Sequence, residues 1–551
     1  MELNKIKTII LVCVLCSIAG ISKAQTPTKY WVKFIDKNGS PYTISSPEAY
    51  LSSKSIARRV NQGIAINETD IPVNQTYINQ VNATGAVVFQ RSKWMNAAIV
   101  IVTNSTQLTA INSLTCVLNT TPVAKMNKFN EDQLSDAPVN SKQLKTTQTS
   151  AYNYGPSFTQ NHQIGADCMH ENGYRGDNIL IGVLDSGFDN VNNNAVFDSL
   201  RNESRIIDTR DIVAGNTSVY EDHNHGAMVL SCISGNTPGQ LIGTGPKAKV
   251  YLIRTEDVAS EKPIEESNWI VGAEYADSVG VDIMTTSLGY TTFDSPFTSH
   301  VYGDLNGKTS PMSIAATMAA RKGIFVLNAN GNDGNNSWRY IGVPADADSI
   351  CSVGSVNGGG LHSGFSSVGP TADGRIKPDL SSMGEGTYVC GTAGNFFSGN
   401  GTSFATPILA GAVACLIQAN PTKTNMEILQ ALKATASKSS NPDNDYGWGI
   451  PNVCRAHDLM NGTAIGVNEL EKSLGFKLFP NPAHYYTSFT LNQKPKKVQL
   501  TDVLGKTTDL IFTESQSGKF MIEFNSSMPA GVYFISIYTS EGFINSKFIK
   551  E

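Results

Sequence analysis

The stretch Asn400-Gly401-Thr402-Ser403-Phe404-Ala405-Thr406-Pro407 leads directly into the apolar run ILAGAVACLI at 408–417. Its small residues predict a tight turn, and the apolar run has the length and spacing of a buried helix. The Ser403 hydroxyl would then lie beside the positive end of a helix dipole, where a nucleophile is well placed. The alternative is that Ser403 only caps the helix, as serine and threonine commonly do.

A second stretch, NILIGVLDSG at 178–187, is a continuous apolar run that ends in Asp-Ser-Gly. A strand that is apolar at every position is typical of a parallel sheet covered on both faces. Helical patterns alternate with further strands of this kind, which lie at Ala248–Ile253, Val281–Leu288, Gly323–Asn328 and Ser349–Val353. The alternation predicts an α/β fold with a doubly wound, mainly parallel sheet, whose functional groups gather at the carboxyl ends of the strands.

Composition divides the chain around this central segment. The strands Lys29–Ile35 and Ala97–Val102 and a helix predicted over Ser46–Arg59 indicate a small N-terminal α+β module. A polar segment then has the composition of a linker open to proteolysis. Short alternating strands near the C-terminus predict a β-sandwich. The expected boundaries are 25–126 for the module, 127–150 for the linker, 151–462 for the α/β domain and 475–551 for the β-sandwich.

The N-terminus has the pattern of a secretory signal peptide over residues 1–24. Lys5 and Lys7 precede a short apolar core, and Ser22-Lys23-Ala24 precedes the expected cleavage site. Lipid attachment at Cys16 is an alternative, but the bulky Leu15 disfavours it. We expect no later apolar stretch long enough to cross a membrane, so the mature protein should be exported and soluble.

Charge argues against a nucleic-acid partner. The chain carries 42 Lys and Arg against 47 Asp and Glu, and it has no long basic tract. A polyanionic substrate is therefore not indicated.

The cysteines permit disulfides without defining them. Six of the nine fall in the central domain, an even number that suits an exported chain, and they are Cys168, Cys232, Cys351, Cys390, Cys415 and Cys454. Cys232 and Cys415 lie in predicted buried helices, where cysteine usually acts as a small hydrophobe. We take Cys351–Cys390 as the first pair to test. No CxxC or HExxH spacing indicates a zinc site.

Three side chains in the α/β domain form a candidate catalytic set. Asp185 ends the first buried strand, His225 begins a predicted helix, and Ser403 begins another. Each has a simpler explanation, since an aspartate can end a strand and a lone histidine can be structural. Together they supply an orienting acid, a base that titrates near neutral pH and a nucleophile that the base would activate.

An oxyanion donor is the remaining requirement, and the segment 328–334 (NANGNDG) offers three amides after a buried strand. Asparagine–glycine clusters are usually turns, so each asparagine taken singly has a turn explanation.

In the order Asp, His, Ser these residues resemble the subtilisin-like serine peptidases, the subtilase family. The matching motifs run in sequence between about Tyr154 and Leu459, and they are Asp185-Ser186-Gly187, His225-Gly226, Ser287-Leu288-Gly289, Gly331-Asn332 and Gly401-Thr402-Ser403-Phe404-Ala405-Thr406-Pro407. The resemblance implies that Asp185 is the acid, His225 the base and Ser403 the nucleophile of a peptide hydrolase. His223 competes with His225, but only His225 precedes the matching glycine.

The same resemblance implies further roles. Asn332 matches the oxyanion side chain, and Asn330 does not, because the family's asparagine directly follows a glycine. Ser287, Leu288 and Gly289 match the strand that pairs with the substrate backbone. No cofactor is required. The family often binds structural calcium, but no compact ligand loop is evident, so we assign no metal ligand.

The resemblance also gives meaning to the flanking modules. The N-terminal module occupies the place of a subtilase pro-region, which assists folding and blocks the active site until it is removed. The C-terminal module, with Phe479-Pro480-Asn481-Pro482-Ala483 and Gly531-Val532-Tyr533, resembles a type A sorting domain of the type IX secretion system. A plain β-sandwich binding domain is the alternative.

Two other functions compete with a secreted endopeptidase that cuts proteins or peptides. A catalytically inactive subtilase fold could serve as a surface-binding protein, although no triad residue is missing. An esterase or lipase would have a Gly-x-Ser-x-Gly motif and the serine first, whereas here the serine comes last. The sequence does not indicate which peptide bonds are cut.

Overall fold

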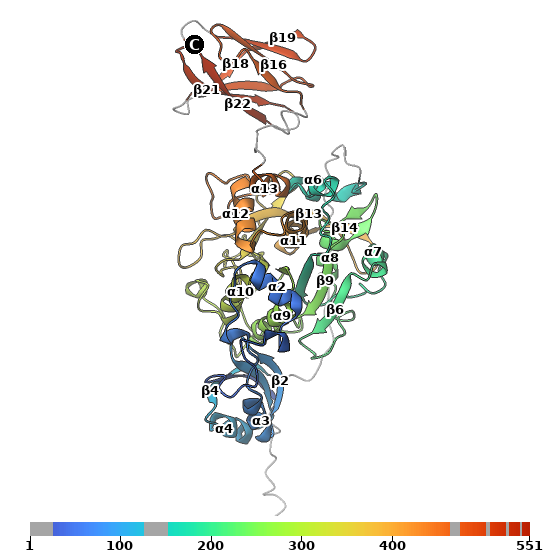
Figure 1. Cartoon of the computed structure of the whole chain (residues 1–551), viewed down its shortest axis with the longest axis vertical. Helices are drawn as coiled ribbons and strands as arrows, with labels where there is room; N and C mark the ends of the chain where they lie inside the picture. The colour runs from blue at the N-terminus through green and yellow to red at the C-terminus, as the bar shows by residue number, and fades with distance from the viewer. Residues whose placement is uncertain (1–25, 126–151, 463–473, 503–506, 525–527, 540–542) are drawn as a thin grey trace, which may run out of the picture. The chain divides into compact units, whose positions relative to one another are not determined.

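The computed structural model describes residues 26–125, 152–462, 474–502, 507–524, 528–539 and 543–551 (Figure 1). The chain divides into two compact units, Met1–His457 and Asp458–Glu551, which are described separately below. The expected signal peptide at 1–24 and the linker at 127–150 lie outside the described residues.

An eight-stranded sheet forms the centre of the first unit, in the order β14-β13-β12-β11-β10-β5-β9-β6. All neighbours are parallel except β13 and β14. The five predicted buried strands are confirmed. Strands β6, β13 and β14 were not predicted, because their polar residues interrupt the apolar pattern of a buried strand. The strands are β5 (Leu180–Asp185), β6 (Ile206–Asp211), β9 (Lys249–Arg254), β10 (Ile283–Thr286), β11 (Phe325–Ala329), β12 (Cys351–Asn357), β13 (Leu380–Cys390) and β14 (Phe396–Asn400).

Helices cover this sheet in two packed pairs. One pair is α8 (His225–Ser234) with α11 (Thr402–Ala419), and the other is α9 (Ile264–Val279) with α10 (Pro311–Arg321). This arrangement confirms the predicted doubly wound fold. Further helices of this domain are α5 (Phe158–Gln163), α6 (Ala166–Glu171), α7 (Asp198–Asn202), α12 (Asn425–Thr435) and α13 (Val453–Met460).

Helix α11 corrects one expectation from the sequence. The sequence predicts no stretch after the signal peptide that is long enough to cross a membrane. Among the described residues, however, α11 is long and apolar enough to do so by length and composition. However, 83% of its apolar window is buried inside the fold. Its contacts with the sheet and with α8 account for that apolar surface.

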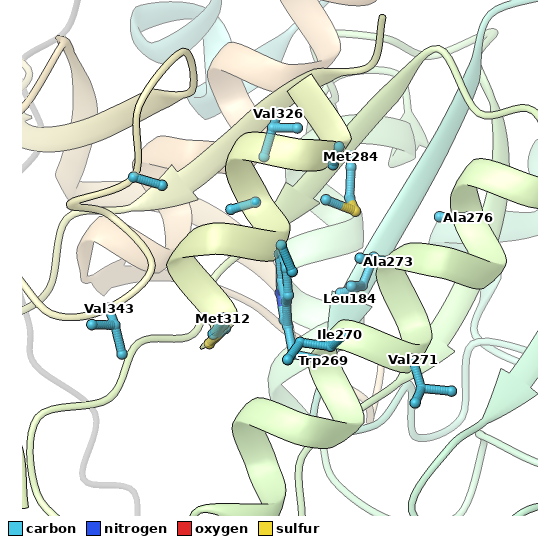
Figure 2. Packing of buried hydrophobic residues seen from close by; sticks show 14 of the residues in the cluster. Leu184, Trp269, Ile270, Val271, Ala273, Ala276, Met284, Met312, Val326 and Val343 are labelled. Atoms are coloured by element: carbon cyan, nitrogen blue, oxygen red, sulfur yellow. The ribbon is translucent and has the colours of Figure 1, made fainter. Parts of the chain in front are cut away.

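The hydrophobic core between the sheet and the α9–α10 pair is centred on Trp269 (Figure 2). Trp269 is fully buried, and its indole N–H donates to the Thr286 hydroxyl at 3.0 Å, so the ring has its polar atom satisfied. Leu184 of β5 and Met284 of β10 belong to the same cluster. This packing holds rigid the strands whose ends carry the candidate site.

The N-terminal module is an α+β fold, as predicted. Its four strands form an antiparallel sheet in the order β2-β3-β1-β4. The helix predicted over 46–59 is wrong in part, because a 3₁₀ turn at Pro47–Ala49 is separated from α2, and the Ser52 side chain caps α2 by accepting the Ser55 N–H. The elements are β1 (Thr28–Phe34), α2 (Ser53–Asn61), α3 (Gln75–Ala83), β2 (Val87–Ser92), β3 (Ala97–Val102), α4 (Ser105–Asn112) and β4 (Val117–Lys125).

This module packs on α9 through buried charged groups. The Glu274 carboxylate accepts the backbone N–H groups of Lys93 at 2.6 Å and Trp94 at 3.0 Å. Asp277 forms ion pairs with Arg58 at 2.5 Å, with Arg59 at 2.9 Å and with the Lys93 ammonium at 3.2 Å. Burial alone would raise the pKa of Asp277, but these three cations lower it well below its usual range.

The second unit consists of two antiparallel four-stranded sheets, which confirms the predicted β-sandwich. Aromatic and branched side chains such as Phe489, Phe520 and Phe548 form its core. One sheet has the order β15-β16-β20-β19 and the other β18-β17-β21-β22. The strands are β15 (Lys477–Phe479), β16 (Tyr486–Thr490), β17 (Lys497–Asp502), β18 (Thr507–Leu510), β19 (Phe512–Gln516), β20 (Lys519–Glu523), β21 (Gly531–Tyr538) and β22 (Phe543–Lys550).

The expected Cys351–Cys390 pair is wrong. Cys351 begins β12 and Cys390 ends β13, and the two strands are parallel with Val353 opposite Leu380. Their ends are on the order of 30 Å apart at the usual rise of a strand, whereas a disulfide needs Cα atoms within about 7 Å. Both thiols are free and buried, and the disulfide instead joins Cys168 of α6 to Cys454 of α13.

Candidate active site

The candidate site lies where four neighbouring parallel strands end. The order β11-β10-β5-β9 brings the carboxyl ends of these strands to one edge of the sheet. Asp185 is the last residue of β5, Ser287 follows β10, and Asn330 follows β11. Segments far apart in the sequence therefore meet at this edge, as expected for a doubly wound sheet.

Asp185 and His225 form a close pair. The Asp185 side chain is fully buried, and its Oδ1 lies 2.8 Å from His225 Nδ1. The same oxygen accepts the Ser186 backbone N–H at 2.8 Å, which fixes the carboxylate. The His225 side chain is 23% exposed, so the imidazole is held on one side and open on the other.

Gly226 permits this close approach. A Cβ atom at this position would lie 2.3 Å from the carbonyl oxygen of Gly187 and 3.0 Å from the Asp185 Cβ. Any side chain would push α8 away from the end of β5. The His-Gly pair in the sequence thus has a steric reason, because the glycine lets the first residue of α8 reach Asp185.

Ser403 is the second residue of α11 and is 9% exposed. It does not cap the helix, because Gly401 occupies the N-cap position and no side chain there makes a capping bond. Instead, the Ser403 hydroxyl donates to the Ser287 carbonyl oxygen at 3.2 Å, while the Ser287 hydroxyl donates to the Ser403 carbonyl oxygen at 2.8 Å. This reciprocal pair ties the start of α11 to the end of β10.

The asparagines of segment 328–334 have different surroundings. Asn332 Oδ1 accepts both the backbone N–H of Thr402 at 2.9 Å and its hydroxyl at 3.0 Å. Asn330 is fully buried and its amide donates to the Ser367 carbonyl oxygen, which is a structural role. Asn328 is also buried and donates to the Leu288 carbonyl oxygen.

Several of these residues line one cavity of about 360 Å³. His225, Ser403 and Asn332 contribute to its wall together with the segment Ser287–Gly289. Asp185 lies behind this wall, fully buried, and contacts His225 from there. The structure therefore brings together the acid–base pair, the hydroxyl, the amide and the predicted substrate-binding strand.

Two further residues of the cavity were not assigned a role from the sequence. His223 lies 2.8 Å from the Ser186 hydroxyl through its Nδ1, and its ring stacks beside that of His225. Glu256 lies two residues beyond β9 and lines the cavity. The sequence held a signal for Glu256, since an acidic residue lies shortly after a buried strand at its functional end.

Comparison with known proteins identifies the family. The chain is 32% identical over 295 residues to subtilisin NAT of Bacillus subtilis subsp. natto, a match that covers 53% of this chain and 68% of the relative. The sequence model of the subtilase family matches residues 176–449. The chain belongs to the subtilase family. It is a serine endopeptidase by membership, with the expected subtilisin-like fold.

Other relatives agree with this subtilase assignment. Subtilisin E of Bacillus subtilis (strain 168) is 32% identical over the same length and coverage. A subtilisin of Bacillus pumilus is 31% identical over 295 residues, which cover 53% of this chain and 95% of the relative. The similarity thus extends over 295 residues and is not limited to short motifs.

The flanking modules of this subtilase also match known domains. Residues 29–147 match the peptidase S8 propeptide domain of Bacteroidota, and residues 477–551 match the secretion system C-terminal sorting domain. The sorting domain indicates export to the cell surface or the medium. Both predicted module types are confirmed.

A calcium site is not assigned in this subtilase. Within the described parts of the chain, no group of three or more His, Cys, Asp or Glu side chains is placed to hold a metal ion. Subtilases generally need no cofactor apart from structural calcium. We assign no described residue of this chain as a calcium ligand.

Proposed function

We propose that this subtilase hydrolyses peptide bonds through an acyl-enzyme, with Asp185, His225 and Ser403 as its catalytic triad. The observation that supports this most directly is the 2.8 Å contact between Asp185 and His225, whose side chain lines the same cavity as Ser403. A base and a nucleophile that line one cavity, with an orienting acid behind the base, are the parts this reaction needs.

The proposed first step is attack by Ser403 on the substrate carbonyl carbon. The Ser403 hydroxyl turns from the Ser287 carbonyl oxygen toward His225 Nε2, which removes its proton as the new C–O bond forms. Asp185 holds the Nδ1–H tautomer of His225 and stabilises the resulting imidazolium. His225 then returns the proton to the leaving amine, and the peptide C–N bond breaks.

The second step removes the acyl group. A water molecule gives its proton to His225 and attacks the ester carbon, and the proton returns to Ser403 as the ester bond breaks. During both steps Asn332 Nδ2 and the backbone N–H of Ser403 donate hydrogen bonds to the oxyanion. Asn332 donates through Nδ2 because its Oδ1 already accepts hydrogen bonds from Thr402. The proposed steps use groups of this protein, the peptide substrate and water.

Substrate binding in this proposal uses the edge of the sheet. The segment Ser287–Gly289 continues β10 into the cavity, so an extended peptide can pair with its backbone. Main-chain pairing would place the scissile carbonyl beside Ser403. Proteins and peptides are therefore the proposed substrates.

The N-terminal module is proposed to act as an intramolecular chaperone and inhibitor. Its contacts with α9 through Glu274 and Asp277 and its shared hydrophobic cluster with Trp269 support such a role. We propose residues 25–126 as this pro-region, 127–150 as the segment cut during activation, and 151–462 as the peptidase domain.

Export is proposed to proceed in two stages. Residues 1–24 would direct the chain to the periplasm, and residues 475–551 would then be recognised by the type IX secretion machinery. The match of residues 477–551 to a sorting domain supports the second stage.

Labelling with a fluorophosphonate probe tests the proposed chemistry. We expect the secreted wild-type protein to be labelled once, at Ser403, and to digest casein, while Ser403→Ala is secreted and folded but does neither. The rate should fall on the order of 10⁶, the loss measured for subtilisin itself. Wild-type protein that binds casein without labelling or cleavage would instead indicate an inactive surface-binding protein.

A further inference from the structure

Glu256 brings a carboxylate into the catalytic cavity that the proposed chemistry does not use. It lines the cavity together with His225, Ser403 and Leu288. Its position follows from the register of the sheet, because Arg254 at the end of β9 pairs with Asp185 at the end of β5. Glu256 therefore lies just beyond the end of β9, beside the reaction centre.

The Glu256 side chain has little to balance its charge. It is half-buried, and its Oε2 accepts the Tyr290 hydroxyl at 3.3 Å. Within the residues that the structure describes, it forms no ion pair with a lysine or arginine. The charged groups that act on it most strongly are Glu261, Asp185 and His225.

Two further acidic side chains, Glu261 and Glu265, interact electrostatically with this carboxylate. Glu265 is fully buried, and its Oε1 has no hydrogen-bond partner among the described residues. Burial, the charge of Glu261 and that of Asp185 raise the pKa of Glu256 to about 8. Burial and Glu256 likewise raise the pKa of Glu265 well above its usual range. A cation brought to this side of the cavity would stabilise the ionised carboxylates.

A pro-region cation, Lys29 of β1, acts electrostatically on these acidic groups. Its charge interacts with Glu265 and Asp257, while burial lowers its pKa. Removal of the pro-region would take this cation away and leave the acidic groups for the substrate. The cavity also has apolar wall residues, Leu288 and the half-exposed Val258, against which a long aliphatic stem can pack.

We propose that Glu256 is a specificity-determining residue that binds a lysine or arginine side chain of the substrate close to the scissile bond. This inference rests on the proposed peptidase function and names its substrate class. The carboxylate binds the cationic end of the side chain, and Val258 and Leu288 contact its methylene groups. An acidic side chain at the same substrate position would be repelled.

Cleavage of a peptide library by the processed, secreted enzyme tests the inference. We expect Lys and Arg to be enriched at one position within about three residues of the cut bond, and Asp and Glu to be depleted there. For the best basic peptide, Glu256→Gln should lower kcat/KM roughly 10- to 100-fold relative to a matched peptide with a neutral side chain. Glu256→Asp, which keeps the charge, should retain part of the preference.

The control variant is Glu221→Gln, which removes an acidic side chain outside the cavity lining. It should leave the ratio of basic to neutral cleavage unchanged. A wild-type enzyme that cuts without preferring basic side chains overturns the inference, as does a Glu256→Gln enzyme with equal losses on both peptides. Loss of fluorophosphonate labelling in the wild type would instead contradict the proposed peptidase function, so the two failures are distinguishable.

Discussion

Asn332 accepts two hydrogen bonds from Thr402, one from the backbone N–H at 2.9 Å and one from the hydroxyl at 3.0 Å. A backbone N–H can only donate, so the side-chain atom of Asn332 that faces Thr402 must be the oxygen. The amide nitrogen is therefore directed away from Thr402, the residue that precedes the candidate nucleophile. This orientation is what an oxyanion donor requires.

Substitution of Asn332 by alanine should lower kcat by about 10²–10³ with little change in KM, the loss that removal of this donor causes in subtilisin itself. Thr402→Val keeps the backbone N–H and loses only the hydroxyl, so kcat should fall by less than about tenfold. Steady-state kinetics on one peptide substrate gives kcat and KM for both variants. Equal losses in both variants would show that Asn332 does not act as a separate donor.

Replacement of Asp185 by asparagine should lower kcat on the order of 10⁴, because the amide no longer holds His225 in the required tautomer. The fold should persist, since the size of the side chain is unchanged. Asp189→Asn, in the loop that follows β5, makes the same change at an aspartate with no assigned part in the triad, so it provides the control and should keep normal turnover. A wild-type rate in Asp185→Asn would contradict the proposed triad.

Removal of the Asp277 carboxylate should destabilise the uncut precursor. Asp277→Ala leaves Arg58, Arg59 and Lys93 without their shared buried partner, at a cost of about 3–5 kcal/mol. Thermal unfolding in a Ser403→Ala background, which keeps the precursor uncut, measures the change. Lys54→Ala breaks the more exposed pair with Asp282 and should cost about 1 kcal/mol or less. An unchanged midpoint for Asp277→Ala would argue against the interface.

The buried Asp379 should make stability depend on acidic pH. Its carboxylate lies 2.7 Å from the Lys377 ammonium and 2.6 Å from that of Lys433. Burial alone would raise the pKa of Asp379, but these two lysines lower it to about 2. Because the folded pKa lies below the unfolded value of about 3.9, this stabilisation is complete above about pH 5 and is lost as the pH falls through 2.

The stabilisation from ionised Asp379 should be about 2–3 kcal/mol at neutral pH. Denaturant unfolding of Ser403→Ala protein between pH 7 and 2 should show this loss, and Asp379→Asn should be less stable at neutral pH and remove that part of the pH dependence. Asp348→Asn, at an exposed position, should follow the parent curve. An identical pH profile for the parent and Asp379→Asn would refute the assignment.

Peptide mapping without reduction should recover Cys168 linked to Cys454. Cys351 and Cys390 should react with an alkylating reagent only after unfolding, because both thiols are buried. Replacement of both linked cysteines by serine should cost about 2–5 kcal/mol of stability, as the bridge closes a long loop. A Cys351–Cys390 peptide in the map would contradict the strand register.

Residue pattern alone was enough to predict much of this protein. Continuous apolar runs such as 178–187 have few alternatives to a buried parallel strand, so five strands of the central sheet were predicted from them. The α/β class, the N-terminal α+β module and the terminal β-sandwich followed from local periodicity, whereas the pro-region role was implied by the family resemblance. Strands β6 and β13 were missed because their polar residues break that pattern, although their neighbours in the sheet still stabilise them.

Contacts between distant segments were decided only by the tertiary structure. The local stretch around Ser403 is compatible with a helix cap as well as with a nucleophile, and the structure places Gly401 at the cap position. The sequence proposed the wrong cysteine pair, because the direction of β12 and β13 is not a local property. The place of Glu256 beside His225 likewise depends on the pairing of β9 with β5, which arises when the sheet assembles. Local patterns determine the elements, whereas sheet order and register determine which side chains meet.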